Sequence, residues 1–316
     1  MSSAPLVVTF GEAMLRLTPP AGERLAGSGQ LSMHVGGAEA NVAAGTAGLG
    51  MRARWFSRVS SLATGDAVLR EIGAHGVDTS YVQRASGRTG LYFLEEGDGP
   101  RPASVVYDRA GSAFAGITGR DAATALESGL LDGASAFVTS GITLALGEGP
   151  SSAARLIWDS AGGLLRCFDV NYRASLATPE EAAAAARHFM ESCDVLVIAE
   201  RDAQALFGTT DLRSRAGDAL VVLTRGSSGA VASAADGVAV PVQALPVGTS
   251  GRIGRGDAFV AGLLTGMLRG LGTAEALRLG VASASYKSSL AGDLARLDSE
   301  AVEALAAGAS GGDVLR

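Results

Sequence analysis

The chain has 316 residues, of which 47% are hydrophobic and 18% are charged, and its formal net charge is −6. This composition is typical of a globular protein with a sizeable core and argues against a disordered chain. The negative charge argues against nucleic acid as the main partner, because nucleic-acid-binding proteins present a basic face to the phosphates.

No basic segment followed by a long apolar one stands at the N-terminus, and no apolar run approaches the roughly 20 residues of a membrane span. We therefore expect a cytoplasmic protein without membrane contact. Cys167 and Cys193 each lie beside an apolar run, which predicts two buried thiols rather than a disulfide or metal site. Lys287 is the single lysine among 26 basic residues, so arginines and backbone N–H groups must bind any anion.

Short β-branched runs alternate with Ala- and Leu-rich helical stretches along the chain. The runs lie at residues 6–10, 54–59, 136–140, 164–169, 195–198 and 220–224. This alternation predicts an α/β fold with a mostly parallel central sheet between two helical layers. Thr178, Pro179 and Glu181 form the signature of a helix N-terminus, with Thr178 as the N-cap and Glu181 completing a capping box.

Two regions interrupt this alternation, at about residues 13–35 and 87–110. Pro, Gly and alternating polar and apolar residues predict strands and turns outside the main sheet, which together form a small β lid. Residues 308–316 are rich in Gly and Ser and predict a flexible tail. We expect one domain over residues 1–316, with the lid inserted in it.

A glycine-dense turn runs directly into an apolar helix at residues 251–262. Gly254 and Gly256 let the backbone approach an anion closely, and a helix N-terminus adds N–H donors and partial positive charge. Asp257 would repel a bound phosphate unless it removes the proton from the hydroxyl that attacks phosphorus. The alternative is that Asp257 only caps the helix. Neither the P-loop pattern nor the dinucleotide-binding fingerprint is present.

Two further segments carry polar groups in positions suited to a ligand. Residues 36–41, Gly-Gly-Ala-Glu-Ala-Asn, place a diglycine before a small-residue helix, although alone this pattern favours a packing helix. Residues 169–173, Asp-Val-Asn-Tyr-Arg, directly follow a predicted strand. Ligands bind at the carboxyl ends of parallel strands, so this second segment indicates a site.

In this order, the three segments resemble the ribokinase-like (PfkB) carbohydrate kinases, and the resemblance spans about residues 7–305. Further segments are similar to the 2-keto-3-deoxygluconate kinase branch of that family, at residues 89–94, 106–113, 140–145, 252–257 and 292–293. The resemblance implies a ribokinase-like three-layer α/β/α fold. It also implies ATP-dependent phosphorylation of the terminal hydroxyl of a sugar acid, with Mg²⁺, and a homodimer formed through the lid.

The resemblance also implies roles for individual residues. Asp257 would be the base, within an anion hole that it forms with Gly254, Arg255 and Gly256. The implied substrate contacts are Gly36, Gly37, Asn41, Tyr92, Tyr107, Arg109, Arg173 and Asp293. The implied ATP contacts are Asn171, Arg173, Thr224, Gly226 and Gly229, and Asp202 is the candidate Mg²⁺ ligand. The chemistry agrees, since Arg109 can grip a carboxylate in a bidentate fork and the tyrosines can stack and donate hydrogen bonds. In the alternative interpretation, Tyr107 and Arg109 are only surface residues of the lid.

The chain departs from the family pattern at several positions. Gly251 stands where relatives often carry Asp, Arg255 where they carry a small residue, and Ala199 where many carry Asn. These changes leave dependence on a monovalent cation open. A kinase for fructose or a nucleoside, a sugar-binding regulator without turnover, and a Rossmann-type oxidoreductase are the competing interpretations.

Overall fold

The computed structural model describes residues 4–97, 100–248 and 253–308. Gly251, Arg252 and residues 309–316 of the expected tail lie outside these ranges. The strands are β1 (Leu6–Phe10), β2 (Met14–Thr18), β3 (Ser32–Gly36), β4 (Arg52–Phe56), β5 (Arg58–Ser60), β6 (Val77–Asp78), β7 (Gln83–Ala85), β8 (Leu91–Glu95), β9 (Ser104–Asp108), β10 (Ala134–Ser140), β11 (Leu165–Asp169), β12 (Val195–Ala199), β13 (Leu220–Thr224), β14 (Ala230–Ser233) and β15 (Ala239–Val242).

The helices connect these strands and cover them. They are α1 (Ala38–Gly48), α2 (Ala63–Ala74), η1 (Phe114–Gly116), α3 (Gly119–Glu127), α4 (Gly141–Leu144), α5 (Glu148–Ser160), α6 (Pro179–Ser192), α7 (Glu200–Phe207), α8 (Arg213–Ala216), η2 (Gly226–Ser228), α9 (Arg255–Leu268), α10 (Thr273–Lys287) and α11 (Ser299–Ala306). None of these helices is long and apolar enough to span a lipid bilayer, as far as the described ranges extend.

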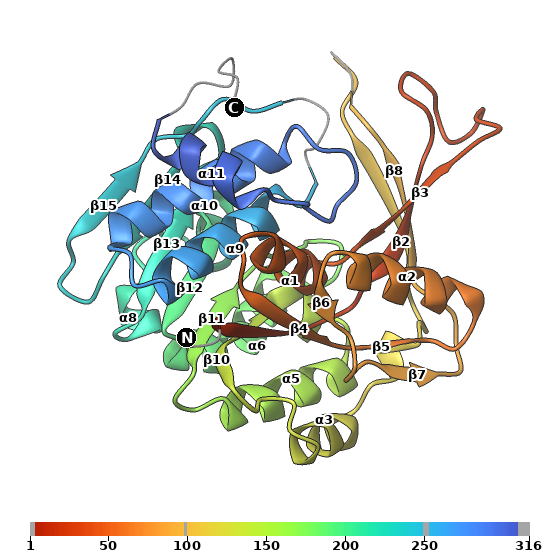
Figure 1. Ribbon diagram of the computed structural model, residues 1–316, viewed down its shortest axis with the longest axis horizontal. Coiled ribbons are helices and arrows are strands. Elements are labelled where there is room, and N and C mark those ends of the chain that lie inside the picture. The colour runs from red at the N-terminus through yellow and green to blue at the C-terminus, as the bar shows by residue number, and fades with distance from the viewer. Residues whose placement is uncertain (1–3, 98–99, 249–252, 309–316) are drawn as a thin grey trace.

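A nine-stranded sheet forms the centre of the molecule (Figure 1), with the strand order β15-β14-β13-β12-β11-β10-β1-β4-β6. The strands from β13 to β6 run parallel, and β14 and β15 add antiparallel pairs at one edge. This confirms the predicted fold class. The expectation of one strand over residues 54–59 is wrong, because the strand is interrupted at Ser57, between β4 and β5. There β5 leaves the main sheet and pairs with β7.

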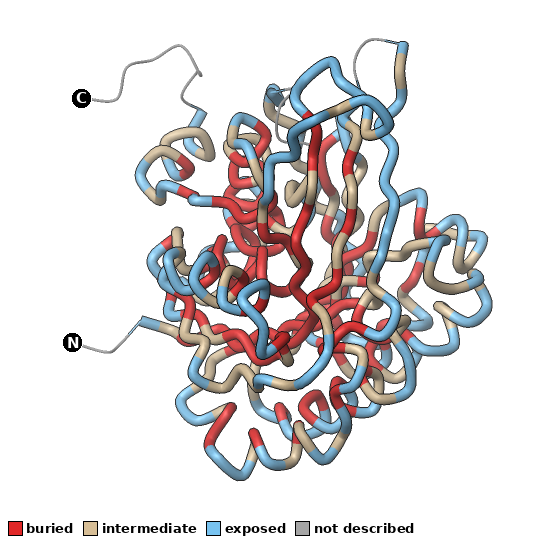
Figure 2. The backbone as a smooth tube through the Cα atoms, turned by 90° about the vertical axis from the view of Figure 1, so that its right-hand side faces the viewer, coloured by how far each residue is buried: buried red, intermediate tan, exposed pale blue. Residues whose placement is uncertain are grey.

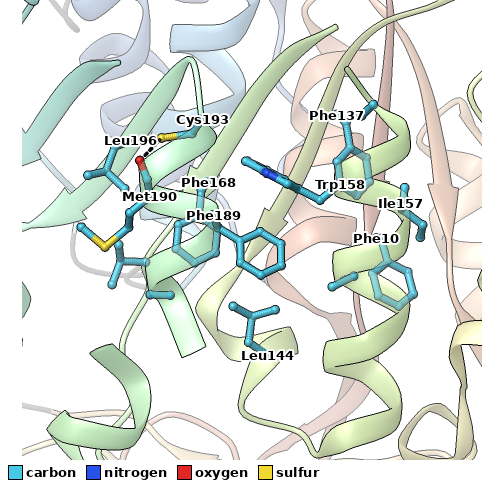
Figure 3. Packing of buried hydrophobic residues seen from close by; sticks show 14 of the residues in the cluster. Phe10, Phe137, Leu144, Ile157, Trp158, Phe168, Phe189, Met190, Cys193 and Leu196 are labelled. Carbon is cyan, nitrogen blue, oxygen red and sulfur yellow. Dashed lines mark hydrogen bonds between the residues drawn. The ribbon is translucent and has the colours of Figure 1, made fainter. Parts of the chain in front are cut away.

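The two faces of the central sheet are buried under different helices, because successive side chains of a strand point to opposite faces. In β1, Val8 and Phe10 pack with residues of α3, α5 and α6, whereas Val7 packs with α1, α9 and α10. Figure 3 shows the first of these layers, in which the Phe168 and Phe189 rings stack with their centroids 5.2 Å apart. Burying each such ring contributes about 2 kcal/mol to folding.

Two local predictions are confirmed. Thr178 and Glu181 form the capping box at the start of α6. Cys167 and Cys193 are free and buried, on opposite sides of the sheet. The Cys193 thiol hydrogen-bonds to the carbonyl of Met190 at 3.3 Å (Figure 3).

The two regions that interrupt the strand–helix alternation form one small sheet, with the strand order β3-β2-β8-β9. The prediction that these strands lie outside the main sheet is confirmed. Figure 2 looks at the molecule from this side and shows the buried residues concentrated in the middle, beneath exposed outer loops. The small sheet therefore adds a wall beside the carboxyl ends of the central strands.

Candidate active site

A cleft of about 400 Å³ lies between the carboxyl ends of the central strands and the small sheet. Its volume is within the range of small-molecule sites. It collects nearly all the candidate residues, although they come from distant parts of the chain. These are Gly36, Gly37, Asn41, Tyr92, Tyr107, Arg109, Asn171, Arg173, Asp202, Thr224, Gly254, Arg255, Gly256, Asp257 and Asp293.

Gly226 and Gly229 line a second cleft of about 240 Å³, which shares Thr224, Arg255 and Gly256 with the first. Its remaining walls are largely apolar: Ala244, Leu245, Val247, Phe259, Val281 and Ala284. A Cβ atom at Gly229 would lie 2.0 Å from the carbonyl oxygen of Val242, so only glycine fits there. An apolar slot that opens into a polar cleft fits a nucleotide, with the base in the slot and the phosphates at the junction.

Asp257 lies in the first turn of α9, whose N-cap is Gly254 in the left-handed region at φ 80°. Within the described residues, no side-chain hydrogen bond caps this helix start. The Asp257 carboxylate instead accepts a hydrogen bond of 2.6 Å from the side-chain amide of Asn41, at the start of α1. Burial raises the pKa of Asp257, against the opposing effects of the Asn41 hydrogen bond and of Arg173 and Lys287. The capping interpretation therefore finds no support in the geometry.

The first intrahelical bond of α9 runs from the Ala258 N–H to the Gly254 carbonyl, at 2.9 Å. The N–H groups of Gly256 and Asp257 therefore have no acceptor within the helix. Gly256 lines both clefts and Asp257 lines the first, so these groups lie where the clefts meet, and the helix dipole adds partial positive charge there. This is the arrangement of an anion-binding helix N-terminus.

Asp293 packs beneath both glycine turns of the cleft. A Cβ atom at Gly36 would lie 2.0 Å from its carboxylate, and one at Gly254 would lie 2.3 Å from its carbonyl oxygen. The carboxylate pairs with the buried Arg16 of β2 at 2.5 Å. Burial raises the pKa of Asp293 to about 6 in spite of Arg16. Asp293 therefore ties the small sheet to the floor of the cleft.

Arg109, the expected carboxylate-binding residue, already holds a carboxylate. Its Nε donates to Glu12 at 2.9 Å and its Nη2 also donates to the same oxygen, while the hydroxyl of Ser112 donates to the other. The guanidinium lies 5.8 Å from the centre of the Tyr107 ring, which in turn packs against Tyr92. Sequence reasoning missed Glu12, which is 97 residues away in the chain and is almost fully buried.

Carboxylates gather where β11 and β12 end. Burial and the neighbouring Asp257 raise the pKa of Asp169 to about 8, and burial also raises the pKa of Asp202. Between them Asn171 adopts a left-handed backbone at φ 40°, which places it in a region that few non-glycine residues occupy. Mg²⁺ at a phosphate site is bound by one or two carboxylates, by phosphate oxygens and by water. Neighbouring carboxylates that repel one another would be stabilised by such an ion.

Two other buried charged residues were not predicted: Glu39 lines the cleft, and Lys287 packs behind Gly254. Glu39 of α1 accepts hydrogen bonds from the N–H and hydroxyl of Ser140 and from the hydroxyl of Thr143, at 2.7 to 3.0 Å. Lys287 is fully buried at the end of α10. For Glu39 the available signal was a single charge in a helix of small residues, because charged side chains are rarely buried without a partner. For Lys287 it was that the chain has one lysine only.

Comparison with known proteins shows which family the chain is similar to. The sequence pattern of the pfkB family carbohydrate kinases matches residues 4–296. A 2-dehydro-3-deoxygalactonokinase of Haloferax volcanii is 37% identical over 316 residues, covering 97% of this chain and 98% of that protein. The crystal structure of a 2-dehydro-3-deoxygluconokinase from Thermotoga maritima has a TM-score of 0.87 at 32% identity, covering 96% of this chain and 99% of that chain.

A putative ribokinase II from E. coli, in complex with ATP and Mg²⁺, shares the fold with a TM-score of 0.80 at 20% identity, covering 92% of this chain and 94% of that chain. The fold is thus that of the ribokinase-like enzymes. The chain belongs to the pfkB family of carbohydrate kinases.

Proposed function

We propose that the protein transfers the γ-phosphoryl group of ATP to the terminal hydroxyl of a 2-keto-3-deoxy sugar acid, with 2-keto-3-deoxygluconate as the first candidate and its 6-phosphate as the product. The observation that carries this proposal is the position of Asp257. Its carboxylate lies beside an uncapped helix N-terminus, where a polar cleft opens into an apolar slot. The names of the two relatives above 30% identity support a sugar acid as the acceptor.

Asp257 acts as the general base in this proposal. The carboxylate takes the proton of the sugar hydroxyl as that oxygen bonds to the γ-phosphorus, while the bond to the bridging oxygen of ADP breaks. Asn41 holds the carboxylate at 2.6 Å and so fixes its orientation toward the cleft. The raised pKa of Asp257 makes it a better proton acceptor than an exposed aspartate.

The N–H groups at the start of α9 hold the negative charge that develops on the transferred group. The backbone of Gly254, Arg255 and Gly256 forms this anion hole with Asp257, and the Arg255 side chain lines both clefts. Bound Mg²⁺ would neutralise phosphate charge, with Asp202 nearby as its protein ligand. Asn171, Arg173 and Thr224 line the same junction and would contact the phosphates.

Recognition of the sugar acid falls to charged and aromatic side chains that line the polar cleft. Arg109 and Arg173 both line it and supply the positive charge that a carboxylate needs. Glu12 accepts hydrogen bonds from Nε and Nη2 of Arg109, so the Nη1 group of Arg109 is the donor that binds the substrate carboxylate. Arg173 supplies the second positive charge. Tyr92 and Tyr107 flank the sugar, and Gly36 and Gly37 let it approach the backbone closely.

The test is ADP release with Mg·ATP and a panel of 2-keto-3-deoxygluconate, its galactonate epimer, fructose and ribose. We expect turnover of the keto-deoxy acids only, and a fall of at least about 10³-fold in kcat for Asp257→Asn. Binding of a sugar acid without any turnover would contradict the proposal and favour a sugar-binding regulator. Preference for fructose or ribose would instead favour a kinase for another sugar.

We further propose that the small sheet acts as the lid and pairs two copies of the chain. Met33, Leu17, Phe93 and Val106 stand opposite one another across its four strands, which places them in one apolar row on one face. Met33 is 56% exposed and Val106 is 54% exposed. Tyr92 and Tyr107 occupy the neighbouring row, on the face toward the cleft, so the apolar row faces away from the site and is available to a second copy.

A further inference from the structure

The single lysine of the chain is completely buried. Lys287 is the last residue of α10, and its Nζ donates to the backbone carbonyls of Leu290 and Gly292, at 3.2 and 2.9 Å. Lysine is among the residues least often buried, because its ammonium loses strong hydration. All the other basic residues of the chain are arginines. The single lysine side chain is thus buried, although burying its ammonium group costs free energy.

The position lies directly behind the anion hole. The Cε atom of Lys287 is 3.3 Å from where a Cβ atom of Gly254 would be, so the lysine stem packs under the N-cap of α9. The carbonyls that Lys287 binds belong to the loop that leads into Asp293. The Asp293 carbonyl oxygen supports Gly254 and its carboxylate supports Gly36. Lys287 thus holds the loop on which both glycine turns rest.

The coordination resembles that of a bound monovalent cation. Backbone carbonyl oxygens that replace a hydration shell are the ligands by which proteins bind K⁺, and an ammonium is an ion of similar charge and size. Arginine could not substitute, because its guanidinium is planar and larger. The end of α10 favours a cation as well, since the carbonyls of a helix C-terminus carry partial negative charge.

We propose that Lys287 is a tethered monovalent cation, a positioning residue whose ammonium fixes the loop under the anion hole and makes phosphoryl transfer independent of added K⁺. This inference rests on the proposed kinase function. The charge acts on the site in two ways: it orders the Leu290–Asp293 backbone through its hydrogen bonds, and it attracts Asp257 across the turn. Burial lowers the pKa of Lys287 to about 8, which leaves the ammonium protonated at neutral pH.

The test compares two variants in buffers that contain K⁺, NH₄⁺ or tetramethylammonium as the only monovalent cation. Lys287→Ala removes the ammonium and leaves room for a free ion, whereas Lys287→Met removes the charge and fills the space. We expect wild-type kcat to be the same in all three salts and both variants to lose about 10²-fold in tetramethylammonium. K⁺ or NH₄⁺ should restore Lys287→Ala by at least about 10-fold, with the change in kcat rather than KM, and should not restore Lys287→Met.

Three outcomes would overturn the inference: K⁺ activation of the wild type, full activity of Lys287→Met, or a folded Lys287→Ala that no small cation rescues. Thermal melting in the same salts gives a readout without turnover. K⁺ should raise the melting temperature of Lys287→Ala and leave that of the wild type and of Lys287→Met unchanged. If wild-type protein phosphorylates no substrate, the proposed function fails, and this melting comparison still decides whether Lys287 occupies a cation site.

Discussion

The ion pair between Arg109 and Glu12 allows a quantitative prediction about stability. The Arg109 side chain is 12% exposed and that of Glu12 is 3% exposed, so Arg109→Ala leaves a carboxylate buried without its cation. Removing one partner of a buried pair costs about 3 to 5 kcal/mol. Because the Ser112 hydroxyl still donates to Glu12, we expect the lower end, about 3 kcal/mol.

The double variant Arg109→Ala/Glu12→Gln separates this penalty from the loss of substrate binding. A neutral amide needs no cation, so the double variant should recover to within about 1 kcal/mol of the wild type. Urea unfolding measures both values, and the KM for the sugar acid should be raised in both variants, since each lacks the guanidinium. Arg88→Ala is the matched control, because Arg88 forms an exposed pair with Asp108 of β9, and it should be close to neutral.

The predicted penalty would be refuted if Arg109→Ala unfolded at the same urea concentration as the wild type. It would also be refuted if Glu12→Gln brought no recovery, since the cost would then not arise from the unpaired carboxylate. A normal KM in the double variant would show in addition that Arg109 does not bind the substrate.

Two further predictions concern pH and assembly. The pKa of Asp169 is raised from about 4 in the unfolded chain to about 8 in the folded one, so the folded state binds the extra proton and loses stability as the pH rises through this window. Asp169→Asn should therefore flatten the decline of the melting temperature between pH 4 and 8, and an unchanged slope would rule out this group as its source. For assembly, light scattering on a sizing column should give twice the chain mass for the wild type and a monomer for Val106→Glu. A monomeric wild type would contradict pairing through the small sheet.

Much of the fold could be predicted from sequence because it is specified locally. The β-branched runs of β1 and β13 have the predicted bounds, and the capping box at Thr178 needs only residues within one helical turn. The break at Ser57 was missed because the run continues without a glycine or proline. The break arises from strand pairing instead. The pairing of β4 with β1 ends at Phe56 and Phe10, and the residues of β5 that follow pair with β7.

The site could be predicted only in part, for a related reason. Short sequence patterns are sufficient to recognise the roles of Gly36, Gly254 and Asp257, because these roles depend on the local backbone conformation. The partners that set their environment are distant: Asn41 meets Asp257 across 216 residues and Glu12 meets Arg109 across 97. Nothing local distinguishes Glu12 from a surface glutamate, and its role depends on which side chain the fold brings to it.

The Arg16–Asp293 pair also determines when the site can form. Arg16 is made early in synthesis and is buried in the native protein, yet its carboxylate partner lies near the C-terminus. Until Asp293 has left the ribosome, Arg16 has no counter-charge, and the floor beneath Gly36 and Gly254 is missing. Such long-range closure slows folding and exposes partly folded intermediates. The growing chain can assemble its central strands, but the floor of the cleft forms only after Asp293 has been made.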